Sequence, residues 1–270
     1  MWAGRRTAVR MEASAVVTAQ APANSLEVID EEAMRAASTF PIPPEELIKK
    51  CQEVLLKGVG CDEPELLAPD FEFAGPVVGP INKEQYLKTV SGAIPAIIDA
   101  FPDTNAQYYD FRVDVFEPNR VWYTSRGIGT MTQPFTLVGE VAPNYKKIEQ
   151  PPQTGSMLFN EQGLCTEVTA GYVMDRREGN TGGLGAVYAV LRHVGISLPY
   201  PEGQPWQPSP AFRLFLEATF LADWLSGGLF GKPPAAENAY WRRPEEELNS
   251  KRAPNKWRVG AVYKPGERRE

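Results

Sequence analysis

Hydrophobic residues recur every three or four positions in two segments early in the chain, and this spacing predicts two helices. The first covers residues 43–56, begins at a Pro-Pro pair followed by two glutamates, and should end at Gly58 or Gly60. The second begins at Asn82, whose side chain can cap a helix, and continues toward residue 101. Pro95 lies inside this second segment, so a kink or break is expected there.

Farther along the chain the apolar spacing changes to two, which is the period of strands with one buried face. Residues 108–115 alternate in this way, and a second strand is expected over 121–132. Two more strands are expected near 155–159 and 166–175. Because helices come first and antiparallel hairpins follow, the pattern predicts an α+β domain.

The register of the first hairpin decides which side chains point inward. If Val115 pairs with Trp122, Arg126 lies opposite Phe111 on an otherwise apolar inner face. A buried guanidinium needs either an internal acid or an anionic or carbonyl ligand. On the last strand, period two places Tyr172 on the same inner face, as an aromatic lid or as a hydroxyl donor to a ligand.

Three further segments flank the predicted domain at 43–176. Residues 1–42 form an N-terminal extension whose arginine-rich, acid-poor start is typical of a plastid targeting peptide or of a disordered terminus. Residues 177–230 should add two helices, the second packing an apolar face on the core. Residues 231–270 form a proline-rich, basic arm that either buries its tryptophans on the domain or docks on an acidic partner.

Composition and charge exclude several classes of function. The 270 residues carry a formal net charge of −6, which disfavours nucleic acid and anionic membranes as partners. No apolar stretch reaches the ~20 residues that span a bilayer. The three cysteines form no C-x-x-C pair, which fits a reducing compartment, and the single histidine, His193, cannot build a multi-histidine metal site. We therefore expect neither a metal nor a cofactor.

A glycine-rich run at residues 179–185 precedes a predicted helix, and such a run can bind phosphate through its backbone amides. However, Tyr188 stands where the dinucleotide fingerprint needs Gly or Ala, and no Gly-Lys-Ser/Thr occurs. A hinge is therefore favoured over a nucleotide site.

Several short motifs follow one another in the order helix, short strand, helix and long antiparallel sheet. They are Leu66-Leu67-Ala68-Pro69-Asp70-Phe71-Glu72-Phe73, Gly75-Pro76, Pro152-Gln153-Thr154-Gly155, the turn ending at Gly163, and Tyr172-Val173-Met174-Asp175. In this order and spacing the chain resembles the nuclear transport factor 2-like superfamily, and within it the SnoaL-like branch related to polyketide cyclases. This resemblance covers residues 44–176. It implies a cone-shaped curved antiparallel sheet closed by helices, with a pocket that in relatives hosts isomerases, dehydratases, cyclases, epoxide hydrolases, carotenoid-binding modules or protein-binding domains.

The acid and base positions implied by the resemblance lack suitable side chains. Gly75 stands where steroid isomerase relatives carry an aspartate, and residues 44–58 contain no tyrosine. Ala170 or Tyr172 stands where the cyclases carry an acid, and His193 lies beyond the last strand. Proton transfer needs a carboxylate or imidazole with a shifted pKa, so these positions disfavour catalysis.

The sequence therefore predicts a non-catalytic binding or assembly protein for a hydrophobic small molecule (a pigment, terpenoid or lipid-like compound) or a protein partner, with a homodimer left open. The alternative is an isomerase, cyclase or lyase acting on a terpenoid, polyketide or pigment, with Arg126 as electrophilic anchor and Tyr172 as proton donor. A third hypothesis is a structural subunit docked through residues 211–270. The expected location is the chloroplast, otherwise the cytoplasm. The expected ligand-binding residues are Phe71, Phe73, Tyr109, Phe111, Trp122, Arg126 and Tyr172.

Overall fold

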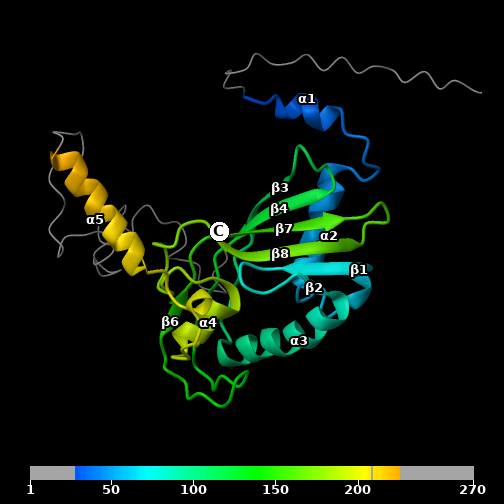
Figure 1. Cartoon of the computed structure of the whole chain (residues 1–270). Helices are drawn as coiled ribbons and strands as arrows, with labels where there is room; N and C mark the ends of the chain where they lie inside the picture. The colour runs from blue at the N-terminus through cyan, green and yellow to red at the C-terminus, as the bar shows by residue number, and fades with distance from the viewer. Residues whose placement is uncertain (1–27, 208, 226–270) are drawn as a thin grey trace, which may run out of the picture.

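A computed structural model describes residues 28–207 and 209–225, so the expected targeting segment and the basic arm lie outside the described residues. Figure 1 shows one large sheet with α2 behind it and α3 beside β1 and β2. The helices are α1 (Glu31–Ala36), α2 (Pro44–Leu56), α3 (Lys83–Ala100), α4 (Ala186–His193) and α5 (Pro210–Leu225), with short 3-10 turns at Pro64–Leu66 and Pro201–Gly203. The strands are β1 (Leu67–Ala74), β2 (Ile81–Asn82), β3 (Tyr109–Val113), β4 (Arg120–Ser125), β5 (Ile128–Thr130), β6 (Lys147–Glu149), β7 (Gln153–Phe159) and β8 (Cys165–Val173).

Both early helices form where their local signals place them. Pro44 occupies the first turn of α2, where a missing N–H costs nothing, and the helix ends before Gly58. At the start of α3 the Asn82 side chain accepts a hydrogen bond from the Gln85 backbone N–H (2.9 Å), and the Gln85 side chain accepts one from the Asn82 N–H (3.2 Å). Helix α3 continues through Pro95 to Ala100, so the expected break does not occur.

The large sheet has the strand order β2-β1-β8-β7-β4-β3. Its pairings are antiparallel except that between β1 and β8, which is parallel. The predicted α+β class with a curved open sheet is thus confirmed, and the sheet is mixed rather than purely antiparallel. We call the face that packs on α2 and α3 the inner face. Its buried core contains Leu47, Cys51, Val54, Leu55, Leu67, Phe71, Tyr86, Val113, Val121, Tyr123, Met157, Phe159, Cys165 and Val168.

The predicted register of the β3–β4 hairpin is wrong. Val113 pairs with Val121, so the predicted pairing of Val115 with Trp122 does not form. Farther along β3 two residues lie opposite Tyr123, and one of them, Asp110, has φ +57°. This bulge changes the alternation along β3. The faces of β4 follow from the hairpin register: Val121 pairs with Val113 of the inner core, so Val121 and Tyr123 lie on the inner face and Trp122 lies on the opposite, outer face.

A second bulge changes the end of β8. Ser156 pairs with Thr169, and Thr154 pairs with Tyr172, so β8 carries one more residue than β7 over this interval. Gly171 has φ +89°, a backbone conformation that glycine adopts without strain. Because paired residues share a face, Tyr172 lies on the outer face with Thr154 and Ser156. Its predicted position on the inner face is therefore wrong.

A second core lies beyond the large sheet. The predicted long strand over 121–132 divides into β4 and β5, and β5 pairs with β6 in a separate two-stranded sheet. The predicted helix near 184–194 forms as α4 and packs its buried residues into this second core. The core consists of Ala96, Ala100, Phe101, Met131, Phe135, Ile148, Leu184, Ala189, Val190, Leu191 and Val194.

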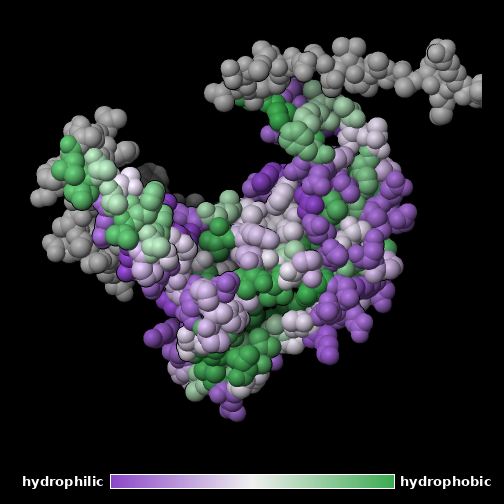
Figure 2. All heavy atoms as spheres, in the orientation of Figure 1, coloured by the Kyte–Doolittle hydropathy of each residue, from purple (hydrophilic) through white to green (hydrophobic). Residues whose placement is uncertain are grey.

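The helix predicted near residues 211–225 forms as α5, but its expected packing on the core is not observed among the described side chains. Figure 2 shows hydrophobic surface on this helix. The helical residues of the two cores come from α2, α3 and α4, and no described residue of α5 is among them. Its exposed apolar residues are Phe212, Leu214, Phe215, Leu221 and Leu225.

Candidate functional site

Aromatic rings line the inner face where β1 meets α3. The ring of Phe71 lies 5.0 Å from that of Tyr86, and Phe73 stacks on the same tyrosine at 5.2 Å. The Tyr86 hydroxyl donates a hydrogen bond to the Val59 carbonyl (2.9 Å), so this buried polar group is satisfied. Two predicted ligand-binding residues, Phe71 and Phe73, are therefore on the inner side of the fold.

A second aromatic group lies where β3 and β4 cross the inner face. Tyr123 stacks on Phe111 with ring centroids 6.1 Å apart and meets Tyr108 edge-on at 5.7 Å. Tyr123 is 4% exposed, and its hydroxyl forms no hydrogen bond with any residue that the structure describes. A buried hydroxyl without a partner is rare in native proteins and calls for an explanation.

Tyr108 connects this group to the surface. The residue is 36% exposed, yet burial raises the pKa of its hydroxyl, and the neighbouring Cys51 raises it further. The hydroxyl end therefore lies inside while another part of the residue remains in solvent. The hydroxyl of Tyr108, like that of Tyr123, has no hydrogen-bond partner among the described residues.

Free thiols complete the interior. Burial raises the pKa of Cys51 to about 12, and it also raises the pKa of Cys61 and Cys165. The Cys165 thiol donates a hydrogen bond to the Glu167 carbonyl (3.3 Å). Since the thiolate is the nucleophile, these protonated thiols are structural rather than reactive groups.

Charged side chains are missing from the described interior. The buried polar residues of the described chain, apart from its tyrosines and thiols, are Thr124, Gln153, Ser156 and Thr181. Burial raises the pKa of Tyr86, Tyr108 and Tyr123, so each stays a neutral hydrogen-bond donor near pH 7. The interior thus offers hydroxyl donors and apolar surface, without a described acid-base pair.

We expect these three tyrosines to resist alkaline ionisation in the native protein. Exposed tyrosines ionise near pH 10, whereas Tyr86, Tyr108 and Tyr123 should absorb as tyrosinate only on unfolding. Because the folded-state pKa values are raised, their contribution to stability is complete below about pH 10 and is lost as the pH rises above it. Absorbance titration combined with urea unfolding at pH 8 and above pH 10 measures both effects. Ionisation of all ten tyrosines near pH 10 in the folded protein would contradict this prediction.

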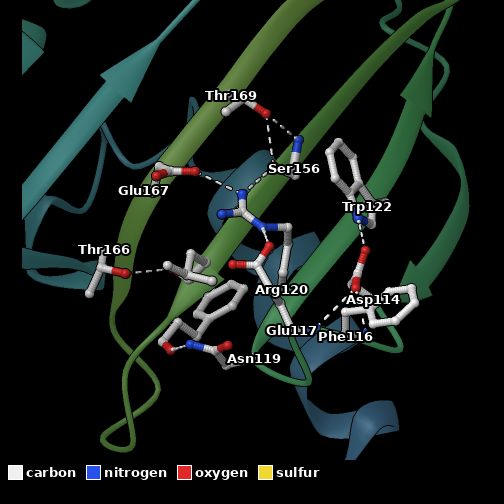
Figure 3. Close-up of polar contacts among 12 residues, drawn as sticks. Asp114, Phe116, Glu117, Asn119, Arg120, Trp122, Ser156, Thr166, Glu167 and Thr169 are labelled. Atoms are coloured by element: carbon white, nitrogen blue, oxygen red, sulfur yellow. Dashed lines mark hydrogen bonds and ion pairs between the residues drawn. The ribbon is translucent and has the colours of Figure 1, made fainter. Parts of the chain in front are cut away.

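The outer face carries a network of polar side chains (Figure 3). The Arg120 side chain is 11% exposed and pairs with Glu117 (2.6 Å) and Glu167 (2.7 Å). It also donates a hydrogen bond to the hydroxyl of Ser156 (2.8 Å), which shares another with Thr169 (2.8 Å). Two carboxylates compensate the guanidinium, so the largely buried cation of Arg120 is accounted for without a ligand.

Three residues predicted to line the interior lie on the outer face. The indole N–H of Trp122 donates a hydrogen bond to Asp114 (2.7 Å), as Figure 3 shows. Tyr109 pairs with Thr124, and both it and Tyr172 are exposed. The register of the hairpin accounts for Trp122, and the bulges in β3 and β8 account for Tyr109 and Tyr172, so the predicted inward positions of all three are wrong.

Arg126 also lies away from the predicted inner face. It follows the end of β4, its backbone N–H bonds to Ala106, and its guanidinium pairs with Glu178 (3.0 Å). The acid that compensates this cation therefore comes from the loop after β8 rather than from the interior.

The structure brings together Phe71, Phe73 and Phe111 of the predicted set on the inner side of the fold. It adds three residues that the sequence had not assigned to the site, namely Tyr86, Tyr108 and Tyr123.

The glycine-rich run is occupied by protein contacts. The buried side chain of Gln153 accepts a hydrogen bond from the Ala186 N–H (2.7 Å) at the start of α4. A Cβ on Gly185 would lie 2.6 Å from the same oxygen, and one on Gly179 would lie 2.2 Å from the Glu149 carbonyl. These glycines therefore permit close packing against β6 and Gln153, which explains the run without a nucleotide.

His193 fits a structural role at the edge of the second core. Its ring lies 5.9 Å from that of Phe101, and Nε2 is 3.1 Å from the Lys146 carbonyl. Burial lowers the pKa of the imidazole.

Within the described ranges no group of three His, Cys, Asp or Glu side chains is placed to bind a metal ion. No helix in that same part of the chain is long and apolar enough to cross a membrane.

Comparison with known proteins gives a likeness of fold. No protein-family model and no curated protein matches this sequence. One solved structure that resembles it is described as a SnoaL-like polyketide cyclase from Jannaschia sp. The two chains are 15% identical, the TM-score is 0.37, and the match covers 49% of this chain and 87% of the other. The epoxide hydrolase/cyclase-like enzyme SalBIII gives 7% identity, a TM-score of 0.37, and coverage of 53% and 96%. An NTF2-like protein of unknown function from Cytophaga hutchinsonii gives 14% identity, a TM-score of 0.29, and coverage of 47% and 86%.

The solved structures thus include SnoaL-like and NTF2-like proteins, as the resemblance leads one to expect, at TM-scores below 0.5 that assign this chain to no superfamily. Identities this low say nothing further about activity.

Proposed function

We propose that this protein holds an apolar small molecule, such as a terpenoid, pigment or lipid-like compound, between the inner face of the sheet and the helices α2 and α3. The observation that carries the proposal is the Tyr123 hydroxyl, which is buried among aromatic rings and has no partner among the described residues. A hydroxyl in such a position gains a hydrogen bond when a ligand supplies the acceptor.

The composition of the interior favours holding over converting. A proton-transfer enzyme needs a group that takes a proton and one that returns it near neutral pH. The described inner residues offer phenols and thiols whose pKa values burial raises, which makes them poor acids. The catalytic alternative relied on Arg126 and Tyr172, and neither lies on the inner face with Tyr123.

Binding can be tested with Nile red, a neutral dye whose emission responds to polarity. We expect saturable binding at one site per chain and a blue-shifted emission. A neutral long-chain diazirine then locates the site, since ultraviolet activation should label peptides from β4, β7 and α3 and Nile red should compete with the labelling. Absence of saturable binding, or labelling confined to the exposed apolar helix α5, would overturn the proposal.

A further inference from the structure

Free hydrogen-bonding capacity in the interior is concentrated at Tyr108 and Tyr123. The third phenol, Tyr86, already donates its hydrogen to the Val59 carbonyl at 2.9 Å. The rings of Tyr108 and Tyr123 meet edge-on with their centroids 5.7 Å apart. The negative charge of an ionised Tyr108 would repel that of an ionised Tyr123 and so raises the Tyr123 pKa. The two hydroxyls therefore lie in the same region. Neither has a partner among the described residues.

Two neighbouring phenol donors match one particular ligand group. A carbonyl oxygen has two lone pairs and no hydrogen, so it can accept one hydrogen bond from each tyrosine. The surroundings of this oxygen would be apolar, since Phe111 stacks on Tyr123 and the adjoining inner-face residues Val113, Val121 and Met157 are buried.

The charge of the ligand follows from what the interior lacks. No Lys, Arg or His among the described residues is fully buried, and Arg120, whose side chain is largely buried, is already paired on the outer face. An ionised carboxylate beside Tyr123 would therefore have no compensating cation, and burying an uncompensated charge is unfavourable. A neutral molecule has no such penalty.

The geometry points to a neutral apolar ligand with a carbonyl oxygen, which Tyr123 and Tyr108 bind by donating their hydroxyl hydrogens. This inference rests on the proposed function, because it specifies the chemical class of the molecule held in the same interior. Because the hydroxyl end of Tyr108 lies inside while another part of the residue is in solvent, the carbonyl oxygen of the ligand should lie at the inner end of Tyr108.

Three probes of equal chain length separate the contributions: a methyl ketone, the corresponding alkane and the corresponding carboxylate. Each displaces Nile red from the full chain. We expect the ketone to bind about tenfold more tightly than the alkane and the carboxylate, the range that one or two neutral hydrogen bonds provide. The infrared carbonyl stretch of the bound ketone should shift to lower frequency.

Tyr123→Phe removes the hydroxyl and keeps the ring. We expect this variant to lose the tenfold preference and most of the infrared shift, with alkane binding unchanged and an unfolding midpoint no lower than that of the native chain. The matched control is Tyr145→Phe, at an exposed tyrosine, which should keep both the preference and the shift.

The outcomes separate the two proposals. If Nile red binds in the interior but the ketone shows no preference, or Tyr123→Phe retains it, the carbonyl inference is wrong and the binding function stands. Preferred binding of the carboxylate would likewise overturn the inference. If no neutral probe binds at all, the proposed function itself fails.

Discussion

Replacing Phe71 with alanine should lower the free energy of unfolding by about 3–5 kcal/mol, the range found for deleting a fully buried phenyl ring. Phe71 is 1% exposed in β1, and its ring contacts Tyr86 from α3. Removing the Phe71 ring would leave a cavity between β1 and α3, next to the ring of Tyr86. Urea unfolding followed by circular dichroism measures the change.

The matched control is Phe116→Ala in the β3–β4 hairpin. Phe116 is 67% exposed, so the same substitution removes little buried area. We expect its free energy of unfolding to stay within about 0.5 kcal/mol of that of the native chain. Equal effects of the two substitutions would show that Phe71 is not part of the core described above.

The helices were predictable because their signals are local. The reciprocal hydrogen bonds of Asn82 and Gln85 need only residues three apart in sequence, and Pro44 has a fixed φ that suits a first helical turn. The limits of α2 and the start of α3 therefore follow from the sequence. The continuity of α3 through Pro95 does not, because packing against β1 and β2 can outweigh the lost hydrogen bond.

The candidate site was predicted only in part, since a single extra residue reverses the faces of a strand. The bulge at Asp110 separates Tyr109 from Phe111 in a way that strict alternation does not show. The predicted residues Phe71 and Phe73 of β1 do lie on the inner side, because their positions need no assumption about a hairpin register. Tyr123 was missed because the assumed register placed its neighbour Trp122 on the inner face instead.

Long-range pairings account for the remaining differences. Arg126 finds its acid, Glu178, 52 residues away, and the side chain of Asn180 bonds both the Glu149 N–H and the Lys147 carbonyl of β6. Neither contact has a local signature. A glycine-rich run that permits such close packing has the same composition as a phosphate-binding loop. The structure favours the packing role, because the Gln153 side chain already accepts the hydrogen bond from the Ala186 N–H at the start of α4.

Gly155→Ala is expected to destabilise the protein by about 1–3 kcal/mol, the usual range for adding a carbon where neighbouring atoms are already in contact. Tyr123 pairs with Gly155 across β4 and β7 and lays its ring over it. An added Cβ would lie 2.5 Å from the Tyr123 Cζ, 2.6 Å from its hydroxyl and 2.7 Å from the Thr169 carbonyl. The ring must move, because the carbonyl belongs to the backbone of β8. Thermal and urea unfolding measure the loss.

Gly92→Ala supplies the same chemical change with the opposite expectation. Gly92 lies within α3, and a Cβ there meets no atom within 4 Å. Alanine should therefore raise the free energy of unfolding by about 0.5–1 kcal/mol through helix propensity alone. Opposite signs for the two variants would place the cost of Gly155→Ala in the contact with Tyr123 and Thr169. A stabilising Gly155→Ala would mean that Tyr123 does not lie over Gly155, and the position of the hydroxyl on which the binding proposal depends would be wrong.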